Sequence, residues 1–142
     1  MKTIDITQDS EYLQQYVDLR NLNHKFLYTG LVTLGETKEW LNRTKVFIVG
    51  LVEDKLYGIG VIYPQKCNEV AIFSSPERLG LGGLILNAVE LKARKEGLKR
   101  LFAWTKSSSK TFLRKGYTLQ GESIKEYQGE RIRGNYFFKE LR

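Results

Sequence analysis

The sequence has few of the residues that bind metals or form disulfides. Among 142 residues there is one cysteine, Cys67, and one histidine, His24. A single cysteine excludes an internal disulfide and a zinc cluster, and a single histidine argues against a histidine-rich metal site. The single histidine also limits triad chemistry, and we expect a cytoplasmic protein.

Long apolar runs are also missing. No stretch approaches the roughly 20 apolar residues of a membrane span, and the opening MKTIDITQDS lacks the apolar stretch of a signal peptide. We therefore expect no membrane partner. An apolar content of 42% and an aromatic content of 12% are typical of a globular protein. We predict a single domain spanning residues 1–142, which is long enough to bury a core.

The charge is strongly positive, with a formal net charge of +7. Basic residues are spread along the chain and are denser from Lys92 to Lys115, but no block of consecutive basic residues occurs. Such a charge suits a nucleic acid, an anionic membrane surface or a polyphosphate ligand. We favour one anionic small ligand over nucleic acid.

The most informative stretch runs from Asn68 to Leu91 and indicates a buried strand, a glycine-rich turn and an amphipathic helix. Gly80, Gly82 and Gly83 fall where the strand passes into the helix. Glycine lets the backbone approach a ligand closely, and the first N–H groups of a helix attract anions. The stretch therefore predicts a pyrophosphate site.

The remaining chain supplies elements on either side of this stretch. Before it we predict a strand, two helices and a hairpin: Lys2–Thr7, Glu11–Lys25, a short helix from a Thr33/Glu36 capping box to about Arg43, and Lys45–Val52 with Leu56–Tyr63. From the central strand onward we predict Glu69–Ser74, the helix Leu81–Glu96, the strand Leu98–Thr105, a serine-capped helix Ser107–Lys115, and strands Tyr117–Tyr127 and Ile132–Leu141 around a turn at Gln128–Arg131. This order predicts one mixed sheet with helices on both faces.

The element order and the motif from Pro76 to Gly82 resemble the GNAT superfamily of acyl-coenzyme A-dependent N-acetyltransferases. The phosphate loop of that family reads Q/R-x-x-G-x-G/A, and here Gly80 and Gly82 match its glycines. Glu77 stands where the family has Gln or Arg, and the neighbouring Arg78 offers a positive charge. The resemblance covers nearly the whole chain.

A second motif of the family follows its fifth strand and reads N-x-x-A-x-x-x-Y-E-x-x-G-F. Here Thr105, Ser108 and Phe112 take the Asn, Ala and Tyr places, and Gly116 with Tyr117 closes the motif. Some branches of the family also use Thr and Phe at these positions.

The resemblance implies an α/β (α+β) fold in three layers, with a central, twisted, mixed sheet of about seven strands whose fourth and fifth strands splay apart. The pantetheine arm of acetyl-CoA would enter between those strands, and the acetyl group would pass directly to a primary amine of a small molecule, such as an amino sugar or amino acid, without a metal. The implied cofactor-binding residues are Ile72, Phe73, Ser74, Arg78, Leu79, Gly80, Leu81, Gly82, Gly83, Thr105, Ser108 and Phe112.

Direct transfer needs a base for the amine and a proton for the leaving thiolate. Glu69, which begins the central strand on the same side as Ala71 and Phe73, is the candidate base, and a solvated strand end is the alternative. Phe112 has no proton to give at the usual acid position. Tyr117 is the nearest tyrosine and the candidate acid, with a core position as the alternative.

The resemblance places the acceptor site at the loop between the first two helices and at the last hairpin. In that loop His24, Phe26 and Tyr28 are the candidate substrate-binding residues, although a lone histidine at a helix end is more often structural. In the hairpin, Tyr127, Arg131, Arg133 and Tyr136 either meet an anionic acceptor or solubilise an exposed edge.

Two other functions stay open at this point. Glu77 and Phe112 also suit a GNAT-like module that binds acetyl-CoA without catalysis and regulates a partner. A basic nucleic-acid-binding domain is the third possibility, and we rank it last because the aromatic residues fall on strands that belong to the core. Members of the resembled family are often dimers, so a homodimer is also an expectation.

Overall fold

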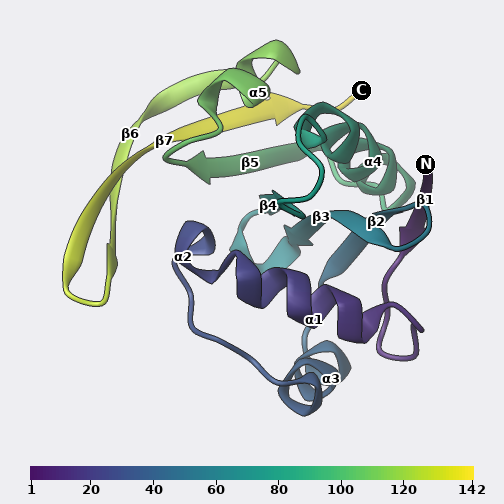
Figure 1. The fold of residues 1–142 in the computed structure, drawn as a ribbon. Coiled ribbons are helices and arrows are strands. Elements are labelled where there is room, and N and C mark those ends of the chain that lie inside the picture. Colours follow the sequence, from purple (N-terminus) through teal and green to yellow (C-terminus); the bar gives the residue numbers. More distant parts are fainter.

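The protein forms one mixed sheet of seven strands with helices on both faces, which confirms the predicted fold class (Figure 1). The structure is a computed structural model that describes residues 1–142, except for the side chain of Phe26. The strands follow the order β1-β2-β3-β4-β5-β7-β6 across the sheet. Their bounds are β1 Lys2–Asp5, β2 Phe47–Val52, β3 Leu56–Tyr63, β4 Glu69–Ser74, β5 Arg100–Thr105, β6 Thr118–Tyr127 and β7 Glu130–Glu140.

The helices divide between the two faces of the sheet. In Figure 1, α1 and α3 lie on one face, whereas α4 and α5 lie on the other. The bounds are α1 Leu13–Leu22, α2 His24–Leu27, α3 Leu34–Arg43, α4 Gly82–Lys95 and α5 Ser109–Arg114, with a short 3₁₀ helix, η1, at Pro64–Lys66. Within the described part of the chain, no helix is both long and apolar enough to cross a membrane.

The predicted first helix is interrupted. α1 ends at Leu22, and Asn23 separates it from the single turn of α2. The side-chain amide of Asn23 donates to the carbonyl of Leu19 at 2.9 Å and to the carbonyl of Ser74 on β4 at 3.2 Å. Asparagine competes with the backbone for such bonds, which is why it favours helix ends. Helix α1 therefore ends at the residue whose side chain also binds the carbonyl of Ser74 on β4.

Side-chain hydrogen bonds support the starts of α3 and α5 in different ways. The capping box at α3 is confirmed, because the Thr33 hydroxyl accepts from the Glu36 N–H and the Glu36 carboxylate accepts from the Thr33 N–H, both at 3.1 Å. The serine cap predicted for α5 is wrong. Ser108 makes no side-chain cap, and the Thr105 hydroxyl instead accepts from the N–H groups of Ser107 and Ser108 at 3.2 and 2.8 Å.

The final hairpin turns in two residues rather than the predicted four. Gln128 and Gly129 have φ values of 50° and 79°, and they join β6 to β7. Two consecutive positive φ values are the mark of a type I′ turn, whose twist matches that of the strands. The hairpin is long, with Tyr127 paired to Glu130 at its end and a register shift between Leu119 and Gly121.

Two apolar clusters pack against opposite faces of the sheet. One lies under α4 and includes Ile85 and Val89, and the other lies under α1 and includes Tyr16 and Phe73. Helix α4 sits directly on β3, because Gly58 and Gly60 leave room for it. A Cβ on Gly60 would lie 2.2 Å from Cγ2 of Val89.

The close approach of α4 to β3 can be tested with Gly60→Ala. The added methyl group cannot fit without moving α4, so the free energy of unfolding should fall by about 1–3 kcal/mol. Denaturant unfolding measures this loss. Gly30→Ala is the matched control, because a Cβ there meets nothing within 4 Å. Equal stability of the two variants would contradict this packing.

Candidate functional site

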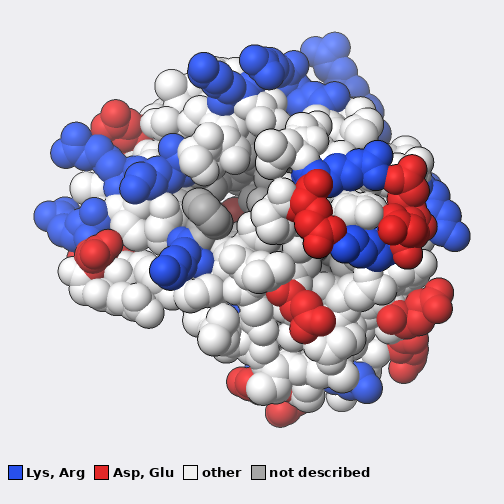
Figure 2. Space-filling model, viewed as in Figure 1, with Lys and Arg blue, Asp and Glu red and all other residues white. Residues whose placement is uncertain are grey.

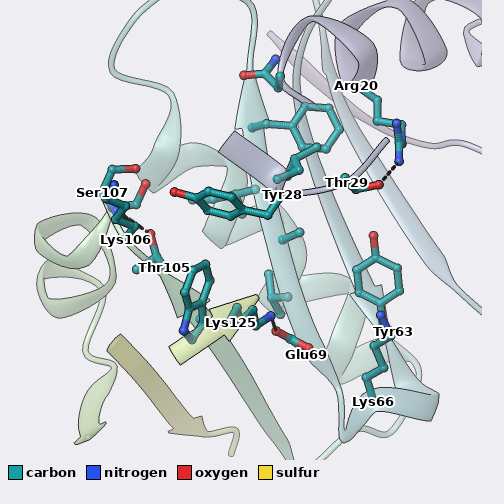
Figure 3. A pocket seen from close by; sticks show the side chains of 18 of the residues that line it. Arg20, Tyr28, Thr29, Tyr63, Lys66, Glu69, Thr105, Lys106, Ser107 and Lys125 are labelled. Atoms are coloured by element: carbon teal, nitrogen blue, oxygen red, sulfur yellow. Dashed lines mark hydrogen bonds and ion pairs between the residues drawn. The ribbon is translucent and has the colours of Figure 1, made fainter. Parts of the chain in front are cut away.

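A cavity of about 480 Å³ opens where β4 and β5 part. The two parallel strands pair only at Glu69 with Phe102 and at Val70 with Ala103, and no further pair forms between them within the described residues. The splay predicted for the fourth and fifth strands is therefore present. Side chains from α1, α2, β3, β4, β5, α5 and β6 line the cavity, and Figure 3 shows several of them converging on it.

The structure brings half of the predicted cofactor-binding residues to this cavity. They come from the two strand ends and from the segment that leads into α5: Ile72, Phe73, Ser74, Thr105, Ser108 and Phe112. Backbone groups of β4 beyond Val70 that face β5 have no strand partner there. Such groups are free to pair with the amides of an extended ligand, as an added strand would.

The predicted phosphate loop lies between β4 and α4. Gly80 has a φ of 80°, a conformation that favours glycine, and α4 begins at Gly82 with no side-chain cap. A Cβ on Gly82 would lie 2.8 Å from Cγ2 of Thr111, so the helix start is packed against α5. Uncapped N–H groups at a helix start attract anions. The loop geometry therefore fits a pyrophosphate.

Basic side chains lie next to the start of α4. Lys106, Lys110 and Arg114 are exposed on α5 and the segment before it, and Figure 2 shows Lys and Arg side chains gathered along the top of the molecule, where Figure 1 places α5. Lys115 donates to the Asn87 side chain on α4 at 2.7 Å. This positive region adds to the attraction of the helix start for phosphate groups.

The charged residues of the loop are held by the turn between β2 and β3. Glu77 forms an ion pair with Lys55, and Arg78 forms one with Glu53. The hydrogen bond with Glu77 raises the pKa of Lys55, and the one with Glu53 raises the pKa of Arg78. Glu77, the residue that departs from the motif of the resembled family, is thus neutralised by Lys55 on the turn between β2 and β3.

Glu69, the candidate base, lies in the cavity at the start of β4. Its side chain is 18% exposed, and Oε1 accepts from Nζ of Lys125 on β6 at 3.0 Å (Figure 3). The same Nζ lies 4.8 Å from the ring centroid of Trp104. Tyr63 on β3 is the register partner of Glu69. The carboxylate therefore lines the cavity and is held by Lys125, which itself lies over Trp104.

Tyr117, the candidate acid, lies away from the cavity. It is buried between α4, α5 and β7, its ring packs edge-on against Phe112 at 5.1 Å, and its hydroxyl has no hydrogen-bond partner among the described residues. Burial, with Glu90 nearby, raises the pKa of its hydroxyl. The structure supports a core role for Tyr117, and Phe112 presents only an apolar ring to the cavity.

Of the three candidate acceptor residues, Tyr28 lines the cavity. It has a φ of 52° and packs edge-on against Trp104 and Tyr127, at centroid distances of 5.5 and 6.0 Å. His24 is not among the lining residues, and the side chain of Phe26 lies outside the described part of the structure.

The last hairpin lines the cavity with Lys125 and Glu126 of β6 and contacts the loop after α2 through Tyr127. The Tyr127 hydroxyl donates to the carbonyl of Thr29 at 2.9 Å, which ties β6 to the loop after α2. Arg131, Arg133 and Tyr136 do not line this cavity. The hairpin therefore borders the cavity through its first strand, β6.

Several lining residues were missed from the sequence: Tyr16, Arg20, Tyr63, Lys66, Trp104 and Lys125. Tyr16 and Arg20 are one helical turn apart on α1, and this spacing is a signal that the sequence does contain. Trp104 and Lys125 lie on strands whose registers are set only by tertiary pairing, so no local pattern marks them.

No protein-family model matches the chain, but many solved structures share its fold. A ribosomal-protein-alanine N-acetyltransferase from Brucella melitensis is 16% identical with a TM-score of 0.84, over 99% of this chain and 100% of that chain. A GNAT superfamily phosphinothricin acetyltransferase from Sinorhizobium meliloti, in complex with AcCoA, is 15% identical with a TM-score of 0.82, over 99% and 88%.

A third similar structure is an acetyltransferase of the GNAT family from Streptococcus pneumoniae, with 17% identity and a TM-score of 0.77 over 99% of this chain and 98% of that chain. The chain therefore has the GNAT acetyltransferase fold from end to end.

The ion pair at the loop predicts that Lys55→Ala weakens acetyl-CoA binding a few-fold at low salt, because Glu77 then faces the phosphates unpaired. Titration calorimetry measures the change, which should shrink as salt is added. The double variant Lys55→Ala with Glu77→Gln removes both charges and should restore affinity. An equal loss in the single and double variants would contradict this role.

Proposed function

We propose that the protein is a GNAT superfamily acetyltransferase that transfers an acetyl group from acetyl-CoA to a primary amine of a small molecule. The observation that carries the proposal is the cavity between the splayed ends of β4 and β5, together with the uncapped, glycine-rich start of α4, which packs against Thr111 next to the lining residue Phe112. The fold shared with acetyltransferases over 99% of the chain supports the same proposal.

The donor would be held by two groups of residues. The backbone from Arg78 to Gly83 would bind the pyrophosphate, and the backbone of Ile72, Phe73 and Ser74 would pair with the pantetheine arm. Thr105, Ser108 and Phe112 would form the opposite wall. When bound, acetyl-CoA supplies the reactive thioester.

The acceptor amine would lie beside Glu69. Its nitrogen bonds to the acetyl carbon, the carbon–sulfur bond breaks, and the amine proton passes to the Glu69 carboxylate, directly or through a water molecule. Lys125 holds this carboxylate in place. With Phe112 apolar and Tyr117 buried outside the cavity, solvent would protonate the thiolate.

A second candidate function is a module that binds acetyl-CoA without catalysis. The observation in its favour is the lack of a proton donor at Phe112, together with the core position of Tyr117. The two functions share the donor site and differ only in turnover.

The experiment that tests the proposal has two stages. Titration calorimetry with acetyl-CoA, and with adenosine bisphosphate as control, should give saturable binding near one per chain. A screen of primary amines by thiol release should then give turnover. Binding with no turnover on any amine supports the non-catalytic module, and no binding at all overturns both functions.

The phosphate loop predicts that Gly82→Asp abolishes acetyl-CoA binding. A carboxylate at the helix start would repel the pyrophosphate, and its Cβ would collide with Thr111. Gly82→Ala meets the same Thr111 contact without a charge and is the matched control. Titration calorimetry should find much weaker binding for Asp than for Ala, and equal affinities would remove the loop from the proposal.

The proposed base predicts that Glu69→Gln lowers kcat by about a hundredfold or more, the usual loss when a general base is removed. The affinity for acetyl-CoA should not change, because Glu69 lies at the acceptor end of the cavity. Steady-state rates across pH and calorimetry give the two values. An unchanged pH–rate profile would exclude Glu69 as the base.

A further inference from the structure

Three hydrogen-bond donors face the acceptor end of the cavity: Arg20 and Tyr16 on α1, and Tyr63 at the end of β3. Tyr63 is the register partner of Glu69, so their side chains are neighbours on one face of the sheet. Figure 3 shows Arg20 and Tyr63 on the same side of the cavity, with the Tyr63 hydroxyl directed toward the loop at Thr29.

Arg20 carries a charge that no carboxylate neutralises. Its guanidinium donates to the Gly30 carbonyl and the Thr29 hydroxyl, both at 2.6 Å, and to the Asn21 amide oxygen at 3.2 Å. All of these acceptors are neutral, and Arg20 forms no ion pair with any described residue. A guanidinium has five N–H groups, so donors remain for a ligand.

The two tyrosines supply neutral donors next to this charge. Neither hydroxyl makes a hydrogen bond to another described residue. Burial raises the pKa of both Tyr16 and Tyr63, so both keep their protons at neutral pH. Both phenol groups therefore stay neutral and can donate a hydrogen bond to a bound molecule.

The side chains that line the whole cavity also carry more positive than negative charge. Four cationic side chains line it, namely Arg20, Lys66, Lys106 and Lys125, against the two carboxylates Glu69 and Glu126. Lys125 is paired with Glu69, whereas Lys66 lies over the ring of Tyr63 at 5.2 Å. The acceptor end therefore has a surplus of positive charge around Tyr63.

We propose that the acetyl acceptor is a small amine with an oxyanion group, a carboxylate or a phosphonate, which Arg20, Tyr16 and Tyr63 bind while the amine lies beside Glu69. This inference rests on the proposed function, because it names the substrate class of the same site. Planar guanidinium groups bind such oxyanions with two parallel hydrogen bonds.

The first test compares amines that differ only in their charge. The probes are α-amino acids and ω-amino acids from glycine to aminocaproate, each with its carboxamide, and aminoethylphosphonate to separate the two kinds of oxyanion. The acid of each accepted pair should have a kcat/KM about ten- to a hundredfold above its carboxamide, the usual gain from hydrogen bonds to a charged group. A preference for the carboxamides overturns the proposal.

The second test removes the proposed donors. Arg20→Gln and Tyr63→Phe should raise KM for the acids and leave KM for the carboxamides nearly unchanged, and Arg20→Lys should recover part of the loss. Arg43→Gln is the matched control. It removes the same kind of charge from α3, where Arg43 is exposed and pairs with Glu39, and it does not line the cavity. Equal losses for acids and carboxamides, or the same loss in Arg43→Gln, would contradict the assignment.

A binding experiment separates failure of this inference from failure of the proposed function. Trp104 and Tyr28 line the cavity, so intrinsic fluorescence in the presence of coenzyme A reports occupancy. Saturable binding of the acids that Arg20→Gln abolishes supports the oxyanion site even if no acetyl transfer occurs. Acetyl transfer to amines without such selectivity, or acid binding that is unchanged in Arg20→Gln, overturns the site and leaves the proposed function intact.

Discussion

The limited pairing between β4 and β5 is the constraint on which the rest of the structure depends. These strands share two register pairs and then part. On one side, β4 stays with β3, because the Ser74 carbonyl is bound by Asn23 and the Ser75 N–H donates to the Tyr57 carbonyl at 2.8 Å. On the other side, the Thr105 hydroxyl at the end of β5 accepts from the N–H groups of Ser107 and Ser108, where the chain turns toward α5. Each strand end is thus held by its own half of the sheet.

The two halves meet again through side chains at the end of the cavity where Glu69 lies. Tyr127 on β6 is bonded to the carbonyl of Thr29, Tyr28 packs against Trp104, and Lys125 pairs with Glu69. These contacts join segments as much as 98 positions apart in the sequence. They cover one end of the cavity, whereas the glycine-rich loop and the start of α4 lie beside the other.

The sequence predicted the local structure well because local chemistry determines it. The bounds of β4, the capping box at Thr33 and the glycine-rich start of α4 all follow from residues within a few positions of one another. The resemblance to one family supplied the splay and the donor site. The interruption at Asn23 was missed, because its cause is a bond to Ser74 on a distant strand. Likewise, the pairing of Glu69 with Lys125 depends on where the β6–β7 hairpin crosses β5.

The difference between local sequence signals and tertiary contacts also explains how Glu77 is tolerated in the phosphate loop. Read from the sequence motif, a carboxylate in the phosphate loop argues against binding a pyrophosphate, because like charges repel. The fold places Lys55 beside it, so the pair is close to neutral and its field falls off quickly in salt water. Among the positive charges that form no ion pair with a described residue are those on α5, near the start of α4, and Arg20 in the cavity. Two separate positive regions are what an enzyme needs when its donor carries phosphates and its acceptor carries an oxyanion, because each ligand then has its own counter-charge.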